Sequence, residues 1–491
     1  MSILVVDIGT SSLRASIVRA DGSVNHLNQE QCQPSTPAPG LVEFNPQNMA
    51  DAVLRVCLKT LADSKLTDKV QAVGITNQRA SAVMWHKSTG APLGNALGWQ
   101  DLRTVGECMV AAAEHGVKVA PNQTATKASW MTQNYINNKQ INPSDVCIGT
   151  VDSFIAAVLS NFDLHITDPS NACVTGLCSL DALSWSPRLC EIFKVNLDSL
   201  PKIVSSTGIL GHATALPGAP PIASLIGDQQ ASLIGQACIT NGATKITFGT
   251  GGMLNIFTGE KSPTKIARNT EGTYPLVAFS DQQKTFWASE AIMLSAGTNI
   301  EWLCQDLQLL ATPSQSHDVA SQVDDTCGVV FVPALFGLGT PHWDYGARGT
   351  LLGLTRGTGR AHVVRAVLEG VAHRGADLLD AVIAETKLPV QTIRIDGGMS
   401  RNPTFVQALA DATARPIEVS PVTEATTLGA AFLAGASTEV WSSVEEAAST
   451  WKPAKVVDPR ISQSTSISRA QWHEAVARSR NWIPSLSSLD F

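Results

Sequence analysis

Residues 3–22 of the chain read "ILVVDIGTSSLRASIVRADG", and this stretch decides the fold. An apolar run at residues 3–6 ends in Asp7, a turn of small residues follows at 9–12, and a second apolar run returns toward an Asp-Gly pair. Short apolar runs bounded by Gly, Ser and Asp are typical of strands joined by turns. We therefore predict a strand, a Gly-Thr turn and a returning strand, with a further turn at 21–22.

The same pattern restarts at residues 243–259, "ATKITFGTGGMLNIFTG", after a Pro- and Gly-rich passage at 211–227. Either hairpin alone is a common feature. Together, in a chain of 491 residues that exceeds one typical core, they indicate two related domains. We predict an N-terminal domain over residues 1–238 and a C-terminal domain over residues 239–491, facing each other.

After the first copy the chain alternates helices with strands. Apolar residues at helical spacing in "QNMADAVLRVCLKTLADS" (47–64) predict a helix, and "KVQAVGIT" (69–76) follows as a buried strand. The expected apolar face of the helix contains Met49, Val53, Val56, Leu58 and Leu61. This order predicts the α/β class, with helices packed on the faces of mixed sheets.

Composition narrows the range of partners. The net charge is −7, with 35 Lys and Arg against 42 Asp and Glu, which argues against nucleic acid or an anionic membrane as the main partner. No stretch approaches the roughly 18 apolar residues of a membrane-spanning helix, and the N-terminus lacks the basic region of a signal peptide. The ten cysteines have no zinc-site spacing, so we expect reduced thiols and a cytoplasmic protein.

The Gly-Thr-Ser-Ser turn at 9–12 has the chemistry to bind phosphate. Its closely spaced backbone N–H groups and three hydroxyls can surround an anion, although it lacks the lysine of a P-loop. Asp7 ends the preceding strand, where a carboxylate can hold Mg²⁺ directly or through water. The alternative is that Asp7 only shapes the turn.

A third stretch, "IRIDGGMSRNPTFVQALADAT" (393–413), ends a strand in Asp396 ahead of two glycines and a helix. Asn402 and Pro403 are a natural N-cap and a natural first helical residue. Glycines beside a helix N-terminus suit an adenine nucleotide lying across the turn. Such a turn alone does not establish a ligand site.

These stretches belong to ten blocks that occur in the order "VVDIGTSS", "GITNQR", "WQDLRT", "GTVDSFI", "TDPSNA", "IGDQQAS", "FGTGG", "SAGTNIEWL", "PALFGLGTPHWDYGARGTLLGLTRG" and "DGGMSRN". In this order they resemble the FGGY family of carbohydrate kinases, and within it the glycerol kinases, from residue 3 to the region of Trp482. Residues 349–369 also fit the pattern by which the C-terminal half of the family is recognised. The resemblance implies two actin-like, ribonuclease-H-like ATPase domains, with ATP, Mg²⁺ and a small polyol or sugar in the cleft between them.

Carried over by motif, the resemblance assigns residues to both ligands. The ATP phosphates would be met by Thr10, Ser11, Ser12 and Arg14 from the first domain and by Thr250 from the second. The nucleotide would be lined by Gly297, Glu301, Gly398 and Asn402, although Glu301 stands where glycerol kinases commonly have glutamine. Asp228 and Gln229 would bind the acceptor, with Asp228 as the catalytic base.

The chemistry of phosphoryl transfer supports the role of Asp228 independently. An alcohol that attacks the γ-phosphate must lose a proton, so an aspartate within hydrogen-bond range is the expected base. Asp228 begins the helix-like "DQQASLIGQA", whose N-terminus should keep the carboxylate ionised. The structural alternative is a helix N-cap.

Three departures from the glycerol kinases fall in the expected acceptor pocket. The arginine of "TNQRASA" (76–82) is kept as Arg79, but Ala80 stands where they have glutamate, Asn122 where they have tyrosine and Met253 where they have phenylalanine. A pocket that loses a dedicated hydroxyl partner loses discrimination, so we predict a wider pocket and an acceptor of about four to six carbons. Arg79 would still hold a hydroxyl, and Asn122 would take a new one. The alternative is a divergent glycerol kinase in which another group replaces the glutamate.

Two other functional classes remain as alternatives. Actin-like filaments and chaperone ATPases share the expected core and hydrolyse ATP without a small acceptor, but the "TNQR" and "GDQQ" blocks suit a polar small molecule. A catalytically silent binding protein would not need both Asp7 and Asp228. Members of the FGGY family often dimerise, so a homodimer is expected through the resemblance alone.

Overall fold

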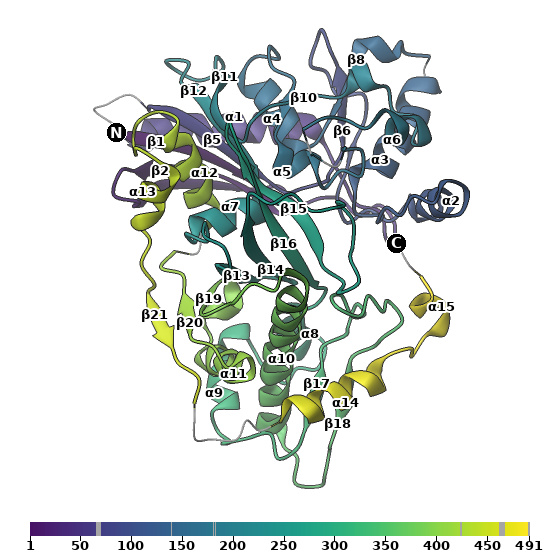
Figure 1. Ribbon diagram of the computed structural model, residues 1–491, viewed down its shortest axis with the longest axis vertical. Helices are drawn as coiled ribbons and strands as arrows, with labels where there is room; N and C mark the ends of the chain where they lie inside the picture. Colours follow the sequence, from purple (N-terminus) through teal and green to yellow (C-terminus); the bar gives the residue numbers. More distant parts are fainter. Residues whose placement is uncertain are drawn as a thin grey trace.

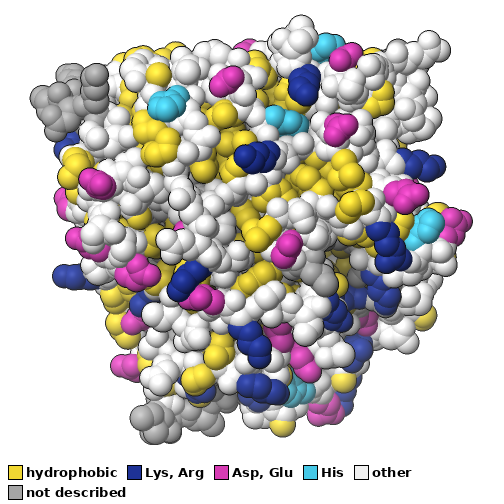
Figure 2. Space-filling model, turned by 45° about the horizontal axis from the view of Figure 1, so that its top comes forward, with side chains coloured by type: hydrophobic (Ala, Val, Ile, Leu, Met, Phe, Trp, Pro, Cys, Tyr) yellow, Lys and Arg dark blue, Asp and Glu magenta, His cyan; other side chains and the backbone are white. Residues whose placement is uncertain are grey.

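The computed structural model describes residues 1–64, 70–138, 140–179, 181, 183–422, 425–460 and 467–489. Figure 1 shows two lobes stacked along the long axis, with the N-terminal half of the chain in the upper lobe and most of the C-terminal half in the lower one. A large mixed sheet forms the centre of each lobe. Figure 2 shows Lys and Arg side chains interspersed with Asp and Glu on the face that it presents.

The first sheet has six strands in the order β11-β12-β5-β1-β2-β3. Its strands are β1 (Ser2–Ile8), β2 (Ser12–Arg19), β3 (Val24–Gln31), β5 (Ala72–Asn77), β11 (Thr207–His212) and β12 (Pro221–Gly227). Strands β1, β2 and β3 form an antiparallel meander, whereas β5 runs parallel to both β1 and β12. The predicted hairpin around residues 9–12 and the strand that follows the first helix are therefore confirmed.

The second sheet has seven strands in the order β15-β16-β14-β13-β19-β20-β21. Its strands are β13 (Thr244–Phe248), β14 (Gly252–Gly259), β15 (Tyr274–Ser280), β16 (Thr285–Met293), β19 (Ile393–Asp396), β20 (Ile417–Val419) and β21 (Lys455–Val457). The succession β16-β14-β13-β19-β20 repeats the succession β3-β2-β1-β5-β12, with the same antiparallel and parallel pairings. This repetition confirms the predicted α/β fold of two related domains.

Helices cover both sheets and connect the lobes. The longer ones are α1 (Pro46–Ser64), α2 (Val105–His115), α3 (Thr124–Met131), α4 (Val151–Leu159), α7 (Asp228–Gly235), α8 (Thr298–Gln305), α10 (Arg360–Thr386), α11 (Pro403–Thr413), α12 (Ala425–Ala436) and α14 (Arg469–Ser479). Helix α12 packs against α7 and against β1, β5 and β12, so a helix from the end of the chain covers the first sheet. None of the helices in the described ranges is long and apolar enough to cross a bilayer.

The remaining strands and α-helices are short. They are β4 (Glu43–Phe44), β6 (Val83–His86), β7 (Ala96–Leu97), β8 (Val146–Gly149), β9 (Ile166–Thr167), β10 (Lys202–Ile203), β17 (Val330–Val332), β18 (Thr350–Leu352), α5 (Pro169–Ala172), α6 (Pro187–Ile192), α9 (Ser316–Ala320), α13 (Val444–Ser449) and α15 (Pro484–Ser487). The ten cysteines are all free thiols, as predicted.

The predicted apolar face of α1 needs one correction. Met49, Val53 and Val56 are buried, but Leu58 is 44% exposed. Leu58 lies two residues after Val56, about 200° around the helix, so it cannot share the buried face. Thr60 is buried in the next turn instead.

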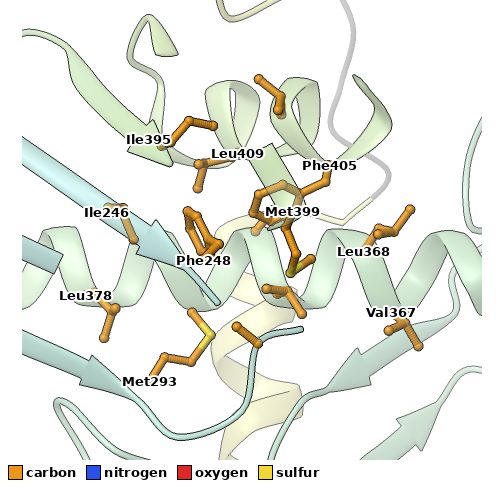
Figure 3. Close-up of a cluster of buried hydrophobic side chains, with 14 of the residues drawn as sticks. Ile246, Phe248, Met293, Val367, Leu368, Leu378, Ile395, Met399, Phe405 and Leu409 are labelled. Carbon is orange, nitrogen blue, oxygen red and sulfur yellow. The ribbon is translucent and has the colours of Figure 1, made fainter. Parts of the chain in front are cut away.

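Two apolar cores place the turns that follow the central strands. In the lower lobe, Phe248 and Phe405 pack edge to face with ring centroids 4.7 Å apart, between β13, α10 and α11 (Figure 3). A second core contains Ile3 and Val5 of β1 together with Phe257 of β14 and Phe432 of α12. Because this core takes side chains from both sheets, it ties the two lobes together behind the strand ends.

Candidate active site

The first Gly-Thr turn is closed by its own backbone. The N–H of Gly9 donates to the carbonyl of Ser12 at 2.9 Å, and the hydroxyl of Thr10 accepts from Nε1 of Trp99 at 3.0 Å. Thr10 is half-buried, Ser11 is exposed and Ser12 is buried. The turn therefore exposes the hydroxyl of Ser11, while Trp99 holds Thr10 in place.

Asp7 lies beside this turn with its carboxylate almost buried. Its Oδ2 accepts from the hydroxyl of Thr426 at 2.9 Å, and Nη1 of Arg14 lies 3.7 Å away. Burial raises the pKa of Asp7, which Arg14 and Thr426 partly offset. Thr426 belongs to α12, so both halves of the chain hold this carboxylate.

The second turn, after β13, is built against the start of α8. The N–H of Ala296 donates to the carbonyl of Thr250 at 2.8 Å, and the N–H of Gly297 donates to the carbonyl of Gly249 at 2.9 Å. A Cβ on Gly297 would lie only 2.6 Å from that carbonyl oxygen, so only glycine fits. The predicted residues Thr250 and Gly297 are thus brought together, and Glu301 lies exposed in the first turn of α8.

The third turn follows β19. Gly397 has φ 87°, in the region that favours glycine, and Gly398 is exposed with open space at its Cβ position. Asn402 is the N-cap of α11, as predicted: its Oδ1 accepts from the N–H of Phe405 at 3.0 Å. Its Nδ2 donates to Ser316 at 2.9 Å, so both ends of this side chain have protein partners. Its predicted contact with nucleotide stays a prediction.

Asp228 is the first residue of α7, and Gly227 is the N-cap, so the N-cap alternative for Asp228 is wrong. Its Oδ1 accepts from the N–H of Gln229 at 2.7 Å and lies 3.6 Å from Nε of Arg79. Burial raises the pKa of Asp228 to about 6, Arg79 opposes this shift, and Asp7 adds to it. Desolvation therefore outweighs the groups that lower the pKa of Asp228, but a carboxyl group with a pKa of about 6 is still mostly ionised at neutral pH.

Arg79 has a protein partner that its neighbours in sequence do not reveal. Its Nη2 donates to Oε1 and Oε2 of Glu290 at 3.1 and 2.9 Å. Glu290 lies in the middle of β16, 211 residues away in the chain and in the other half of the protein. The side chains of Arg79 and Glu290 are only 12% and 6% exposed, so the pair is largely desolvated.

Gln229 is also held from the second sheet. Lys245, fully buried on β13, donates from Nζ to Oε1 of Gln229 at 2.8 Å and to the hydroxyl of Thr247 at 2.9 Å. This leaves the NH₂ group of the Gln229 amide as a donor for a ligand.

The expected acceptor pocket is partly assembled. Ala80 is buried with φ 63°, and its carbonyl accepts from the hydroxyl of Thr124 at 3.1 Å, which ties the start of α3 to the Arg79 loop. Asn122 is exposed in the loop just before α3. Met253 is half-buried on β14, opposite Thr247 of β13. The structure thus joins the segments that contain Ala80 and Asn122.

Sequence reasoning missed Trp99, Lys245, Glu290 and Thr426. For Lys245 and Glu290 a signal was present, because each is a charged residue inside an otherwise apolar or small-residue strand, "TKITF" and "TFWASEAIM". A charge at such a position is costly to bury unless a partner is supplied. Thr426 gave no comparable signal, since its hydroxyl reaches Asp7 only through the packing of α12 on β1.

The comparisons with known proteins agree with this geometry. The family model for the FGGY carbohydrate kinase N-terminal domain matches residues 2–235, and the model for the C-terminal domain matches residues 244–438. A glycerol kinase of Janthinobacterium sp. (strain Marseille) is 36% identical over 98% of this chain and 99% of its own length. A glycerol kinase of Gloeobacter violaceus is 35% identical over 98% of this chain and 97% of its own length.

Solved structures give the same picture. A Plasmodium falciparum glycerol kinase with ADP superposes with a TM-score of 0.89 at 31% identity, over 97% of this chain and 98% of that one. A xylulose kinase from Lactobacillus acidophilus superposes at 0.84 with 22% identity, over 99% and 98% of the two chains, which supports the fold alone. Matches to both family models, together with relatives above 30% identity along nearly the whole length, show that this chain belongs to the FGGY family of carbohydrate kinases.

Proposed function

We propose that this protein transfers the γ-phosphate of ATP to a terminal hydroxyl of a polyol or open-chain sugar, with Asp228 as the general base. The observation that carries the proposal is the placement of Asp228 at the start of α7, 3.6 Å from Arg79 and next to Gln229. Its pKa of about 6 suits a base that is ionised near neutral pH yet still binds a proton.

The three turns would bind ATP, the other substrate of the reaction. Ser11, Ser12, Thr250 and the backbone N–H groups around them offer donors to the phosphates, and Gly297, Gly398 and the α8 segment offer a surface for the nucleoside. Because the transferring phosphoryl group passes through a loose transition state, positioning and charge stabilisation are the main tasks of these residues.

The donor set beside Asp7 fits Mg²⁺. Asp7 and the turn hydroxyls are hard oxygen ligands, which Mg²⁺ prefers, and Asp7 would hold the ion directly or through water. When bound, the ion would neutralise charge on the ATP phosphates. The Thr426 hydroxyl and the Arg14 guanidinium both approach Oδ2 of Asp7, so they fix the direction in which its carboxylate faces.

Charge in the pocket favours an uncharged acceptor. Of the basic side chains beside Asp228, Arg79 is paired with Glu290 and Lys245 donates to Gln229 and Thr247 while lying close to Asp396. Neither is left to neutralise the carboxylate of a sugar acid. A polyol or sugar needs only hydrogen bonds, which Gln229, Arg79 and Asp228 can provide.

We infer the length of the acceptor from the side chains at positions 80, 122 and 253. Ala80 offers no carboxylate, Asn122 is an exposed amide, and Met253 is flexible and lacks a ring. These features support an acceptor of about four to six carbons over glycerol, because hydroxyl discrimination depends on dedicated partners. The second candidate is a divergent glycerol kinase, which the 35–36% identity to glycerol kinases favours.

One assay separates the functional classes: ADP release measured with and without glycerol, tetritols, pentitols and ketopentoses. We expect turnover that depends on the acceptor, with a longer acceptor ahead of glycerol in kcat/KM. Glycerol ahead by a wide margin would contradict the wider pocket, and turnover without acceptor would indicate an ATPase. A cytoplasmic location and a homodimer are further proposals; they rest on the ten free thiols and on the family resemblance, and sedimentation would test the second.

A further inference from the structure

Three polar side chains form a continuous row across the buried second sheet. Lys245 on β13 pairs in register with Asn255 on β14, and Asn255 pairs with Glu290 on β16. Directly paired residues of neighbouring strands point to the same face of a sheet. Lys245 and Asn255 are fully buried, and Glu290 is 4% exposed. We call these three residues the polar row.

Both ends of the polar row reach residues of the first domain. At one end Lys245 donates to Oε1 of Gln229, and at the other end Glu290 accepts two hydrogen bonds from Nη2 of Arg79. In the middle, Nδ2 of Asn255 donates to Oε2 of Glu290 at 3.1 Å. The row therefore contacts the two side chains that flank Asp228.

Stability alone is a weak explanation for the row. Burying charged groups costs free energy that their mutual attraction often fails to recover, and apolar residues of similar volume can be equally stable. Several neighbouring positions of these strands, including Leu254, Ile256, Ala288 and Ala291, are buried and apolar. A buried row of a lysine, an amide and a carboxylate is better explained by what it orients.

We propose that the polar row positions the acceptor-binding groups: Glu290, held by Asn255, fixes the guanidinium of Arg79, and Lys245 fixes the amide of Gln229. This inference rests on the proposed function. The acidic partner of Arg79 is thus supplied by residue 290 of the second domain, although residue 80 is alanine. The guanidinium therefore keeps its orientation without a carboxylate at residue 80.

Arg79 interacts with two carboxylates, that of Glu290 in the polar row and that of Asp228. Nη2 faces Glu290, whereas Nε faces Oδ1 of Asp228 at 3.6 Å. The charged groups that act on Asp228 are Arg79, Asp7 and Lys245. If Glu290 is neutralised, Asp228 becomes the carboxylate on which the charge of Arg79 acts. The pKa of Asp228 should then fall, which makes Asp228 a weaker base. Removing Lys245 takes away a cation and should make Asp228 harder to ionise.

The test compares Glu290→Gln, Asn255→Leu and Lys245→Met with the wild-type enzyme in steady-state kinetics from pH 5 to 9. Glu369→Gln is the matched control, since Glu369 is also nearly buried and accepts from Arg365 at 2.8 Å on α10. Misplacing substrate-binding groups should lower kcat/KM for the acceptor by about 10-fold or more in Glu290→Gln and Lys245→Met, with KM for ATP little changed. The acid limb of kcat/KM should move to lower pH in Glu290→Gln and to higher pH in Lys245→Met.

The opposite movements distinguish positioning from general loss of structure, because a merely destabilised fold does not shift the acid limb in two directions. Asn255→Leu, which changes no charge, should raise the acceptor KM without moving the limb, and it decides the question alone if the other two variants do not fold. Unchanged acceptor KM in these variants of an active enzyme would overturn the inference and leave the proposed function intact. A wild-type protein without acceptor-dependent turnover would refute the proposed function and this inference with it.

Discussion

The proposed role of Asp228 as a base requires its carboxylate to be ionised at the working pH and still able to accept a proton. Burial raises its pKa to about 6, and Arg79 keeps it from rising further. Turnover should therefore fall as the pH drops through about 6, because the protonated carboxyl cannot accept the hydroxyl proton. A kcat/KM profile against pH measures this directly, and a profile flat down to pH 5 would contradict it.

The same shift predicts a change in stability with a defined sign. The pKa of Asp228 in the fold is above the ordinary value for aspartate, so its stabilising contribution is full at acid pH and is lost as the pH rises through about 6. Asp228→Asn stays neutral at every pH. The thermal midpoint of this variant relative to wild type should therefore rise between pH 4 and pH 8. A difference that stays constant over this range would show that the pKa is not raised.

Asp7 offers a third prediction at this scale. Asp7→Ala should abolish turnover because the proposed Mg²⁺ ligand beside the phosphates is lost, while stabilisation of the fold by the acceptor survives. Thr426→Val removes only the hydroxyl that donates to Asp7 at 2.9 Å, so it should keep most of the activity. Thermal shifts with MgADP and with the acceptor, measured separately, read out both effects. Persisting activity in Asp7→Ala would reduce Asp7 to a turn residue.

Helices α7 and α12 set the position of Asp228 through their close approach. The Cβ that alanine would add at Gly429 of α12 would overlap the carbonyl oxygen of Ala231 on α7. Gly429→Ala should therefore cost ~1–3 kcal/mol of stability, as overpacking does, and lower turnover by shifting α7. Gly106→Ala in α2 is the control, since nothing lies within 4 Å of its Cβ position. Equal midpoints for the two variants in thermal unfolding would contradict the account.

At the scale of helices and strands, features that depend on nearby residues could be predicted from the sequence, and features that depend on distant residues could not. The hairpins, the α1 helix and the cap at Asn402 follow from local patterns, because each depends on residues a few positions apart. The pairing of Arg79 with Glu290 joins residues 211 positions apart, and no local pattern indicates which carboxylate meets which guanidinium. Leu58 was misplaced because an apolar residue by itself does not define the buried face. The raised pKa of Asp228 depends on burial that only packing reveals.

At the scale of the whole molecule, the two lobes share one apolar core and face each other at the strand ends. A kinase must exclude water when ATP and acceptor are bound, since hydrolysis is the competing reaction. Small-angle scattering should show compaction when a non-hydrolysable ATP analogue and the acceptor are both present. The radius of gyration should change less with either ligand alone. An unchanged radius at concentrations shown to saturate both sites would argue against closure.

The most direct test of the central claim is the stoichiometry of the product. Wild-type protein is incubated with ATP, Mg²⁺ and the best acceptor of the polyol and sugar panel, and ADP and the phosphate ester are quantified by mass spectrometry. We predict one phosphate ester for each ADP, and a loss of at least ~10²-fold in both for Asp228→Asn, the scale expected for a positioned base. ADP without phosphate ester, or undiminished ester formation by Asp228→Asn, would contradict the account.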